Sequence, residues 1–221
     1  MRTLIINFKN YPEVLGEGAV SLARAAEKAS RRISVELIVA PPQPSLGLVA
    51  AHTELQVFSQ SVSDRGDGAS TGSVVVEAVK AAGATGTLLN HSESPIAKGQ
   101  LESLVPRLKA EGLKVCLCAK TARQAATLSR LGPEYIAVEP PELIGSGVAV
   151  SRARPQLLSD TVAKVRGAGY KGRILCGAGI TNGSDVERAV ELGVQGVLVA
   201  SSVVKAKDWV ATISELARAL V

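Results

Sequence analysis

The stretch RILCGAGITNGSDVERAVELGVQGVLVA, residues 173–200, decides the fold, because two short apolar runs flank one amphipathic segment. The apolar runs cover 173–177 and 196–200. The segment between them, 184–192, has helical periodicity, follows Asn182-Gly183 and ends just before Gly193. A side-chain cap at the start and a glycine after the end are typical helix boundaries. The stretch therefore predicts a strand, a helix and a second, parallel strand.

The same alternation continues through the whole chain. Apolar runs cover 3–7, 35–40, 55–60, 86–90, 113–118, 135–139, 173–177 and 196–200. Helical patterns cover 18–31, 74–82, 101–110, 122–131, 156–168, 184–192 and 209–220, with a shorter segment at 44–51. Strands that recur about every 28 residues predict a closed (β/α)8 barrel of α/β class, in one domain spanning 1–221. An open doubly wound sheet is the competing architecture, but no Gly-x-Gly-x-x-Gly follows the first run.

Composition restricts the class of protein further. Hydrophobic residues make up 46% of the 221 residues and aromatic residues only 3%, which suits an aliphatic parallel sheet buried on both faces. The net charge is +5, but basic residues are scattered without interleaved aromatics, so we expect no nucleic-acid partner and instead a small anion such as a phosphorylated metabolite. Cys116, Cys118 and Cys176 lack the spacing of metal ligands, so we expect buried reduced thiols and no metal. The first apolar run is too short for a signal peptide and none approaches a membrane span, so we expect a soluble cytoplasmic protein without a membrane partner.

Polar and small residues follow five of the predicted strands. In a parallel barrel the carboxyl ends of all strands open on the same rim, where the active sites of such barrels lie. The residues at this rim are Asn7-Phe8-Lys9, Asn90-His91-Ser92-Glu93, Glu139, Gly177-Ala178-Gly179 and Ala200-Ser201-Ser202. A carboxylate, an imidazole, an ammonium group and two small-residue turns are therefore expected to converge.

The segment after the sixth predicted strand is the most informative of these. It reads AVEPPELIGSG, residues 137–147, with Glu139 at the strand end, two prolines next and a glycine-rich close. A carboxylate followed by a stiff hinge, a small apolar tip and a flexible hinge is typical of a proton-abstracting base covered by a closing lid. Taken alone, the segment is equally consistent with a Pro/Gly-rich surface loop.

Taken together, these motifs resemble those of triosephosphate isomerases of the compact archaeal type, over the full length of the chain. The similar motifs are Asn7-x-Lys9, His91-Ser92-Glu93, the segment 137–147, Cys176–Ile180 and Val197–Ser201. The resemblance implies a TIM barrel with a reduced helical segment after strand six. It also implies interconversion of dihydroxyacetone phosphate and D-glyceraldehyde 3-phosphate through an enediolate, in glycolysis and gluconeogenesis, without a cofactor.

The resemblance assigns a role to each catalytic residue. Glu139 would be the base, His91 a neutral imidazole that polarises the carbonyl oxygen, and Lys9 a fixed positive charge near the phosphate and the developing oxyanion. Asn7 would bind substrate in the same pocket, and Glu93 would support the site by pairing with Lys9. The phosphate would lie on Ile144, Gly145, Ser146, Gly179, Ala200 and Ser201. Ser202 stands where many relatives have glycine.

The resemblance also suggests self-association. Arg65–Gly72 is similar to a loop that, in the family, inserts into a partner subunit, so a homodimer or homotetramer is expected. Two alternatives stay open from the residues: another phosphate-binding barrel enzyme, of the kind used in tryptophan or thiamine synthesis, and a non-catalytic barrel that binds phosphate.

Overall fold

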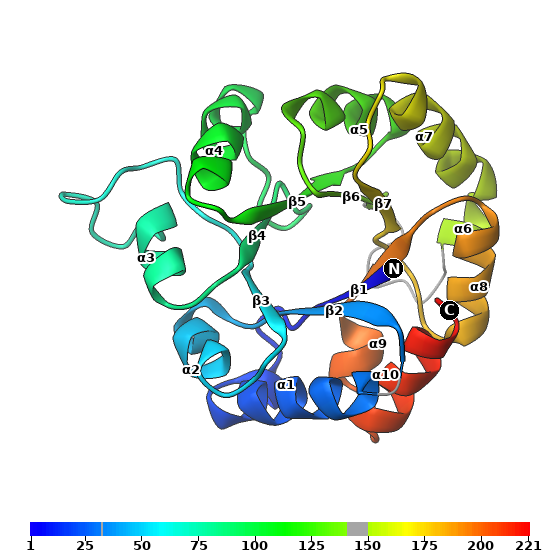
Figure 1. Ribbon diagram of the computed structural model, residues 1–221, viewed down its shortest axis with the longest axis horizontal. Helices are drawn as coiled ribbons and strands as arrows, with labels where there is room; N and C mark the ends of the chain where they lie inside the picture. Colours follow the sequence, from blue (N-terminus) through cyan, green and yellow to red (C-terminus); the bar gives the residue numbers. More distant parts are fainter. Residues whose placement is uncertain (32, 141–149) are drawn as a thin grey trace.

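The computed structural model describes residues 1–31, 33–140 and 150–221. Eight parallel strands form a closed barrel in sequence order, with the helices around it, as Figure 1 shows. The strands are β1 (Arg2–Asn7), β2 (Val35–Ala40), β3 (Gln56–Ser59), β4 (Gly86–Leu89), β5 (Lys114–Ala119), β6 (Tyr135–Val138), β7 (Arg173–Cys176) and β8 (Gly196–Val199). The predicted (β/α)8 architecture is confirmed, and each predicted strand is correct to within one residue at either end.

The longer predicted helices are confirmed with small shifts at their ends. They are α1 (Glu17–Ser30), α3 (Val76–Ala81), α4 (Lys98–Ala110), α5 (Ala122–Leu128), α7 (Pro155–Gly167), α8 (Gly183–Glu191) and α10 (Trp209–Arg218). The segment expected at 44–51 contains the 3-10 turn Gln43–Ser45 and α2 (Leu46–Ala50), and the predicted 122–131 helix finishes in the 3-10 turn Ser129–Leu131. Three short elements fall outside the segments with helical periodicity: the 3-10 turn Pro12–Val14, α6 (Val150–Ala153) and α9 (Ser201–Val204). Each has at most one helical turn, which is too short to show a hydrophobic period.

The predicted helix boundaries have the expected chemistry. The side chain of Asn182 caps α8 by accepting a hydrogen bond from the amide of Asp185, at 3.1 Å. Gly193, after the same helix, has a φ of +94°, a conformation that side chains with a Cβ rarely adopt. These two residues fix the length of α8 and hence the point at which β8 starts.

The hydrophobic residues form two separate cores. One lies between the strands and the surrounding helices, where Leu4, Ile6 and Val39 pack. The other fills the barrel interior and includes Ile5, Ile38, Phe58, Leu88, Cys116, Tyr135 and Leu198. Alternate residues of each strand thus face opposite sides, and both sides are buried, as the aliphatic composition predicts.

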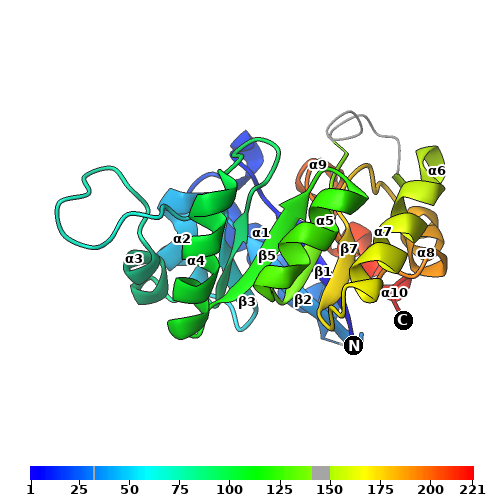
Figure 2. The same cartoon turned by 90° about the horizontal axis from the view of Figure 1, so that it is seen from above.

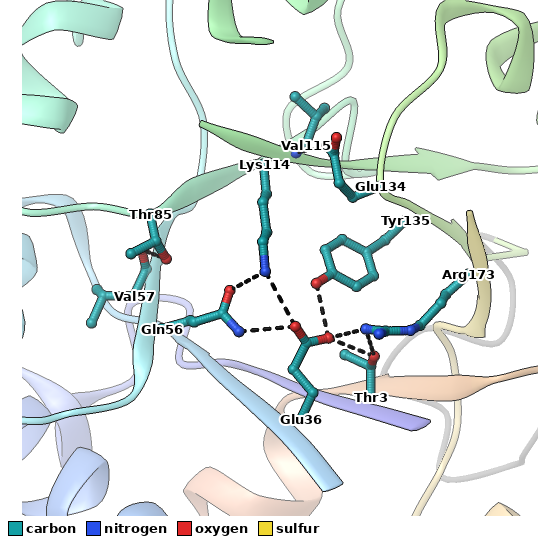
Figure 3. A network of polar contacts seen from close by, with 10 residues as sticks. All are labelled: Thr3, Glu36, Gln56, Val57, Thr85, Lys114, Val115, Glu134, Tyr135 and Arg173. Atoms are coloured by element: carbon teal, nitrogen blue, oxygen red, sulfur yellow. Dashed lines mark hydrogen bonds and ion pairs between the residues drawn. The ribbon is translucent and has the colours of Figure 1, made fainter. Parts of the chain in front are cut away.

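A charged network closes the amino-terminal end of the barrel. Figure 3 shows the Glu36 carboxylate at its centre, contacted by Thr3, Gln56, Lys114, Tyr135 and Arg173 from five other strands. These hydrogen bonds and the Arg173 charge outweigh burial and hold the pKa of Glu36 at about 2, well below its usual range. The network keeps this end of the barrel shut, so the opposite end is the open one.

The chain between β3 and α3 projects from the barrel as a long loop, drawn in cyan in Figures 1 and 2. The base of this loop is fixed to α4, because Gln100 donates a hydrogen bond to Asp64 at 2.9 Å and Arg107 donates one to the carbonyl of Arg65 at 2.8 Å. Residues 64–69 and 71–72 are exposed. Among the described helices, none has the length and apolar character that a membrane crossing requires.

Candidate active site

The alternation of side chains along each strand points the predicted site residues toward the barrel axis. Side chains two residues apart point to the same face of a strand. Ile5 of β1 fills the barrel interior, and Asn7 follows it on the same face; Leu88 of β4 is followed in the same way by Asn90. On β6, Tyr135 and Ala137 face the interior and Glu139 comes next. The predicted rim residues therefore stand directly above the apolar core.

Glu139 is a buried carboxylate without a hydrogen-bond partner in the described structure. It is 1% exposed, and both of its carboxylate oxygens lack a partner. Burial raises the pKa of Glu139 to about 8, although the Cys118 thiol and the Lys9 charge lower it. An unpaired carboxylate whose negative form is disfavoured by burial is a strong base held ready for a proton.

His91 faces Glu139 across the site. Its Nε2 atom lies 3.5 Å from Oε1 of Glu139, and the backbone N–H of Glu93 donates a hydrogen bond to its Nδ1 at 3.2 Å. An Nδ1 atom that accepts a hydrogen bond carries no proton, so the neutral ring carries its proton on Nε2 and points it into the site. Burial lowers the pKa of His91, as the Lys9 charge does to a smaller extent, and this outweighs the opposing effect of Glu93. The structure thus favours the neutral form of the His91 ring.

Lys9 lies on the same rim, held by Glu93 from the loop after β4 and by Asn7 at the end of β1. Its ammonium group pairs with Glu93 at 2.6 Å, as the resemblance implied, and its backbone N–H donates a hydrogen bond to the side chain of Asn7 at 3.0 Å. Lys9 has a φ of +51°, and Asn90, beside His91, has one of +59°. These are the only two residues other than glycine with positive φ in the described chain, and such strained backbone is concentrated at functional sites.

These side chains line one cavity of about 290 Å³ at the carboxyl end of the barrel. The predicted residues Asn7, Lys9, His91, Glu139, Gly179, Ala200 and Ser201 all contribute to its wall. Glu93 does not line it and reaches the site through Lys9 and His91. The predicted lid residues Ile144, Gly145 and Ser146 lie outside the described residues.

The small-residue turns leave backbone groups open to the cavity. Gly179 has a φ of +74°, which the turn after β7 requires. The helix α9 begins at Ser201, and the first amides of a helix have no partner within it. Ser202 itself lines the cavity. The wall formed by these turns suits an anion such as phosphate.

Two further residues shape the site, and neither role was predicted from the sequence. A Cβ placed on Gly177 would lie 2.5 Å from Cγ of Glu139, so only glycine leaves room for the carboxylate. Gln60 donates hydrogen bonds to the carbonyl of Lys9 at 2.9 Å and to that of Ala40 at 3.1 Å, and thereby fixes the strained loop after β1. Gln60 stands at the end of the third predicted strand, so its position on the rim was the available signal.

The donors of the described residues do not form a metal site. No group of three or more His, Cys, Asp or Glu side chains within them is arranged to hold a metal ion. Cys116, Cys118 and Cys176 are buried free thiols, and His52, outside the site, bonds through its Nδ1 to the carbonyl of Leu48 at 2.8 Å.

Comparison with known proteins agrees with this geometry. The family model described as triosephosphate isomerase matches residues 2–216. The chain is 48% identical over 217 residues to the triosephosphate isomerase of Cenarchaeum symbiosum, which covers 98% of this chain and 97% of the relative. It is 44% identical over 218 residues to the triosephosphate isomerase of Caldivirga maquilingensis, and the match covers 99% of this chain and 97% of the relative. It is 41% identical over 215 residues to that of Methanosarcina acetivorans, and the match covers 97% of each chain. The chain belongs to the triosephosphate isomerase family.

Proposed function

We propose that this protein interconverts dihydroxyacetone phosphate and D-glyceraldehyde 3-phosphate. The observation that carries the proposal is the pairing of a buried, unpartnered Glu139 carboxylate with a neutral His91 whose Nε2 lies 3.5 Å away, in a cavity that Lys9 also lines. The family match supports the same reaction. It favours neither a different phosphate-binding barrel enzyme nor a non-catalytic barrel.

Glu139 is the group we assign as base. It removes a proton from the carbon that bears the hydroxyl group in dihydroxyacetone phosphate and returns one to the neighbouring carbon, while the proton of that hydroxyl group passes to the former carbonyl oxygen. The same side chain can serve both carbons because they are adjacent and the carboxylate has two oxygens. Its burial supports this role, since a carboxylate with a raised pKa gains more by taking a proton.

His91 and Lys9 are the groups we assign to the oxygen atoms. The Nε2–H of His91 donates a hydrogen bond to the carbonyl oxygen, where negative charge develops as the enediolate forms. The Lys9 ammonium, fixed by its pairing with Glu93 at 2.6 Å, adds a positive charge to the same pocket. Preorganised donors of this kind stabilise the transition state more than the ground state. Asn7 and Glu93 hold Lys9 in place.

The phosphate group of the substrate is proposed to lie on the turns after β7 and β8. Support comes from Gly179, Ala200 and Ser201, which line the cavity beside Lys9. The resemblance alone adds Ile144, Gly145 and Ser146 to the proposed phosphate site. A phosphate held against backbone amides fixes the reacting carbons relative to Glu139.

The remaining expectations are part of this proposal. We place the reaction in glycolysis and gluconeogenesis in the cytoplasm, without a metal or cofactor. The protein self-associates as a homodimer or homotetramer, with Arg65–Gly72 at the interface. The exposed tip of this projecting loop, above a base fixed to α4, supports that role.

The experiment that tests the function is isomerisation in both directions, with wild type beside Glu139→Gln. The proposal expects rapid turnover by wild type and a loss of at least about 1,000-fold in the variant, because general base catalysis and its geometry are removed together. Inhibition by a phosphorylated enediolate mimic should persist in both proteins. A folded wild type that binds the mimic without turnover would contradict the proposal, as would a variant with near-native kcat.

A further inference from the structure

A second lysine, Lys205, lines the active-site cavity together with Lys9. Lys205 follows α9, and its Nζ lies 4.7 Å from the centre of the Tyr11 ring, which lines the same cavity. The lysine comes from the loop after β8 and the tyrosine from the loop after β1, and these two strands are hydrogen-bonded neighbours in the barrel. Two adjacent loops thus meet over one edge of the cavity.

The backbone around both residues is fixed. The amide of Lys205 donates a hydrogen bond to the carbonyl of Ser201 at 3.0 Å, and the Trp209 indole donates one to the carbonyl of Val204 at 3.0 Å. Tyr11 precedes Pro12, and its carbonyl accepts a hydrogen bond from Val14 at 3.1 Å. The ammonium group of Lys205, although its residue is exposed, is therefore held over the ring instead of extending freely into solvent.

The two lysines of the cavity differ in their charge balance. Lys9 is paired with Glu93 at 2.6 Å, so much of its charge is already compensated. Lys205 forms no ion pair with any residue of the described ranges 1–31, 33–140 and 150–221. An aromatic face holds a cation without neutralising it. The uncompensated positive charge of the cavity wall therefore lies at Lys205, next to Ser201 and Ser202.

We propose that Lys205, positioned by the Tyr11 ring, binds the phosphate dianion of the substrate and sets the preference of the site for doubly charged ligands. This inference rests on the proposed function, since it deepens the substrate recognition of the same site. Lys205 transfers no proton in the proposed reaction. It therefore contributes to substrate binding and to the rate at which enzyme and substrate associate. Attraction between a surface cation and a dianion acts on association and weakens with salt.

The experiment compares Lys205→Gln with the matched control Lys207→Gln. Both variants remove one positive charge, and Lys207 is an exposed residue two positions later that does not line the cavity. We expect Lys205→Gln to raise the KM for glyceraldehyde 3-phosphate and the inhibition constant of inorganic phosphate by about 2- to 5-fold, from the strength of an ordinary exposed charge pair. The kcat should change less than about 2-fold, and the decline of kcat/KM with salt should become shallower. Lys207→Gln should match wild type in all four quantities.

A second pair of variants tests the role of the ring. Tyr11→Leu removes the aromatic face and should reproduce part of the KM increase of Lys205→Gln, whereas Tyr11→Phe keeps the face and should raise KM less than Tyr11→Leu does. Equal effects of Lys205→Gln and Lys207→Gln would overturn the proposal, because only the net charge would then matter. An unchanged KM and inhibition constant in Lys205→Gln would overturn it as well.

Direct titration of inorganic phosphate by calorimetry separates this proposal from the proposed function. If wild type lacks isomerase activity but binds phosphate more tightly than Lys205→Gln does, the function fails and the role of Lys205 stands. If wild type isomerises the triose phosphates and both proteins bind phosphate equally, the function stands and the role of Lys205 fails. Absence of phosphate binding to wild type overturns the role of Lys205.

Discussion

Glu139→Gln should make the protein more stable at alkaline pH while it removes activity. Burial raises the pKa of Glu139 to about 8 from an ordinary value of 4.5, so the folded state binds a proton that the unfolded state has released. The folded state then loses stability as the pH rises from 4.5 to 8 and is constant beyond that range. Glutamine has nearly the same shape and no proton to release, so the variant does not suffer this loss.

The size of the effect follows from the two pKa values. Each unit of pKa difference corresponds to about 1.4 kcal/mol, and between pH 5 and pH 9 the Glu139 contribution changes by at most about 4 kcal/mol. Relaxation of the protein around the buried charge reduces its cost, which makes this value a ceiling. For a chain of this size, a difference of that order moves the midpoint of thermal unfolding by about 10 °C.

The assay is urea denaturation of wild type and Glu139→Gln at pH 5 and pH 9, at one fixed protein concentration because any self-association adds to stability. Glu187→Gln, which changes an exposed carboxylate on α8, is the matched control. We expect the stability difference between Glu139→Gln and wild type to grow with pH, and the difference for the control to stay constant. A difference that is the same at both pH values would refute the argument that burial disfavours the Glu139 carboxylate.

Three further variants probe other parts of the account. His91→Asn should lower kcat by about 100-fold or more with a smaller change in KM, because the hydrogen bond of His91 is strongest to the enediolate. Changes of similar size in kcat and KM would argue against an electrophilic role. Gly177→Ala should lower kcat by about 10-fold or more, since its Cβ would lie 2.5 Å from Cγ of Glu139, whereas Gly99→Ala, with no atom near its Cβ, should match wild type in the same assay. Glu36→Ala should lower the free energy of unfolding by about 3 kcal/mol, because it leaves the Arg173 and Lys114 charges without their carboxylate at the closed end of the barrel. The kcat of the folded variant should be retained. An unchanged free energy of unfolding would show that the network is dispensable.

The barrel itself could be predicted from local patterns. Strands and helices alternate with clear hydrophobic periods, and glycines such as Gly193 mark helix ends, so each element is visible within ten or so residues of sequence. Closure then places every strand end on one rim, which is why Asn7, His91 and Glu139 could be expected to meet. The very short helix α9 shows no hydrophobic period, because it has a single turn.

The unpredicted features depend on contacts between distant parts of the chain. The Glu36 network joins six strands, and no segment of sequence shows that Arg173 and Lys114 will meet one carboxylate. The approach of Gly177 to Glu139 is likewise visible only once β6 and β7 are side by side. The positive φ of Lys9 depends on the Asn7 side chain and on Gln60, which lies 51 residues further along.

Isomerisation in D2O, followed by NMR of the product, tests most directly whether Glu139 moves a proton between adjacent carbons of a triose phosphate. The account predicts that wild type converts dihydroxyacetone phosphate to glyceraldehyde 3-phosphate with solvent deuterium at the newly protonated carbon, because a proton held by a carboxylate exchanges with solvent. It also predicts that Glu139→Gln forms neither labelled product nor labelled substrate at a comparable rate. Product without solvent deuterium, formed at similar rates by both proteins, would contradict it.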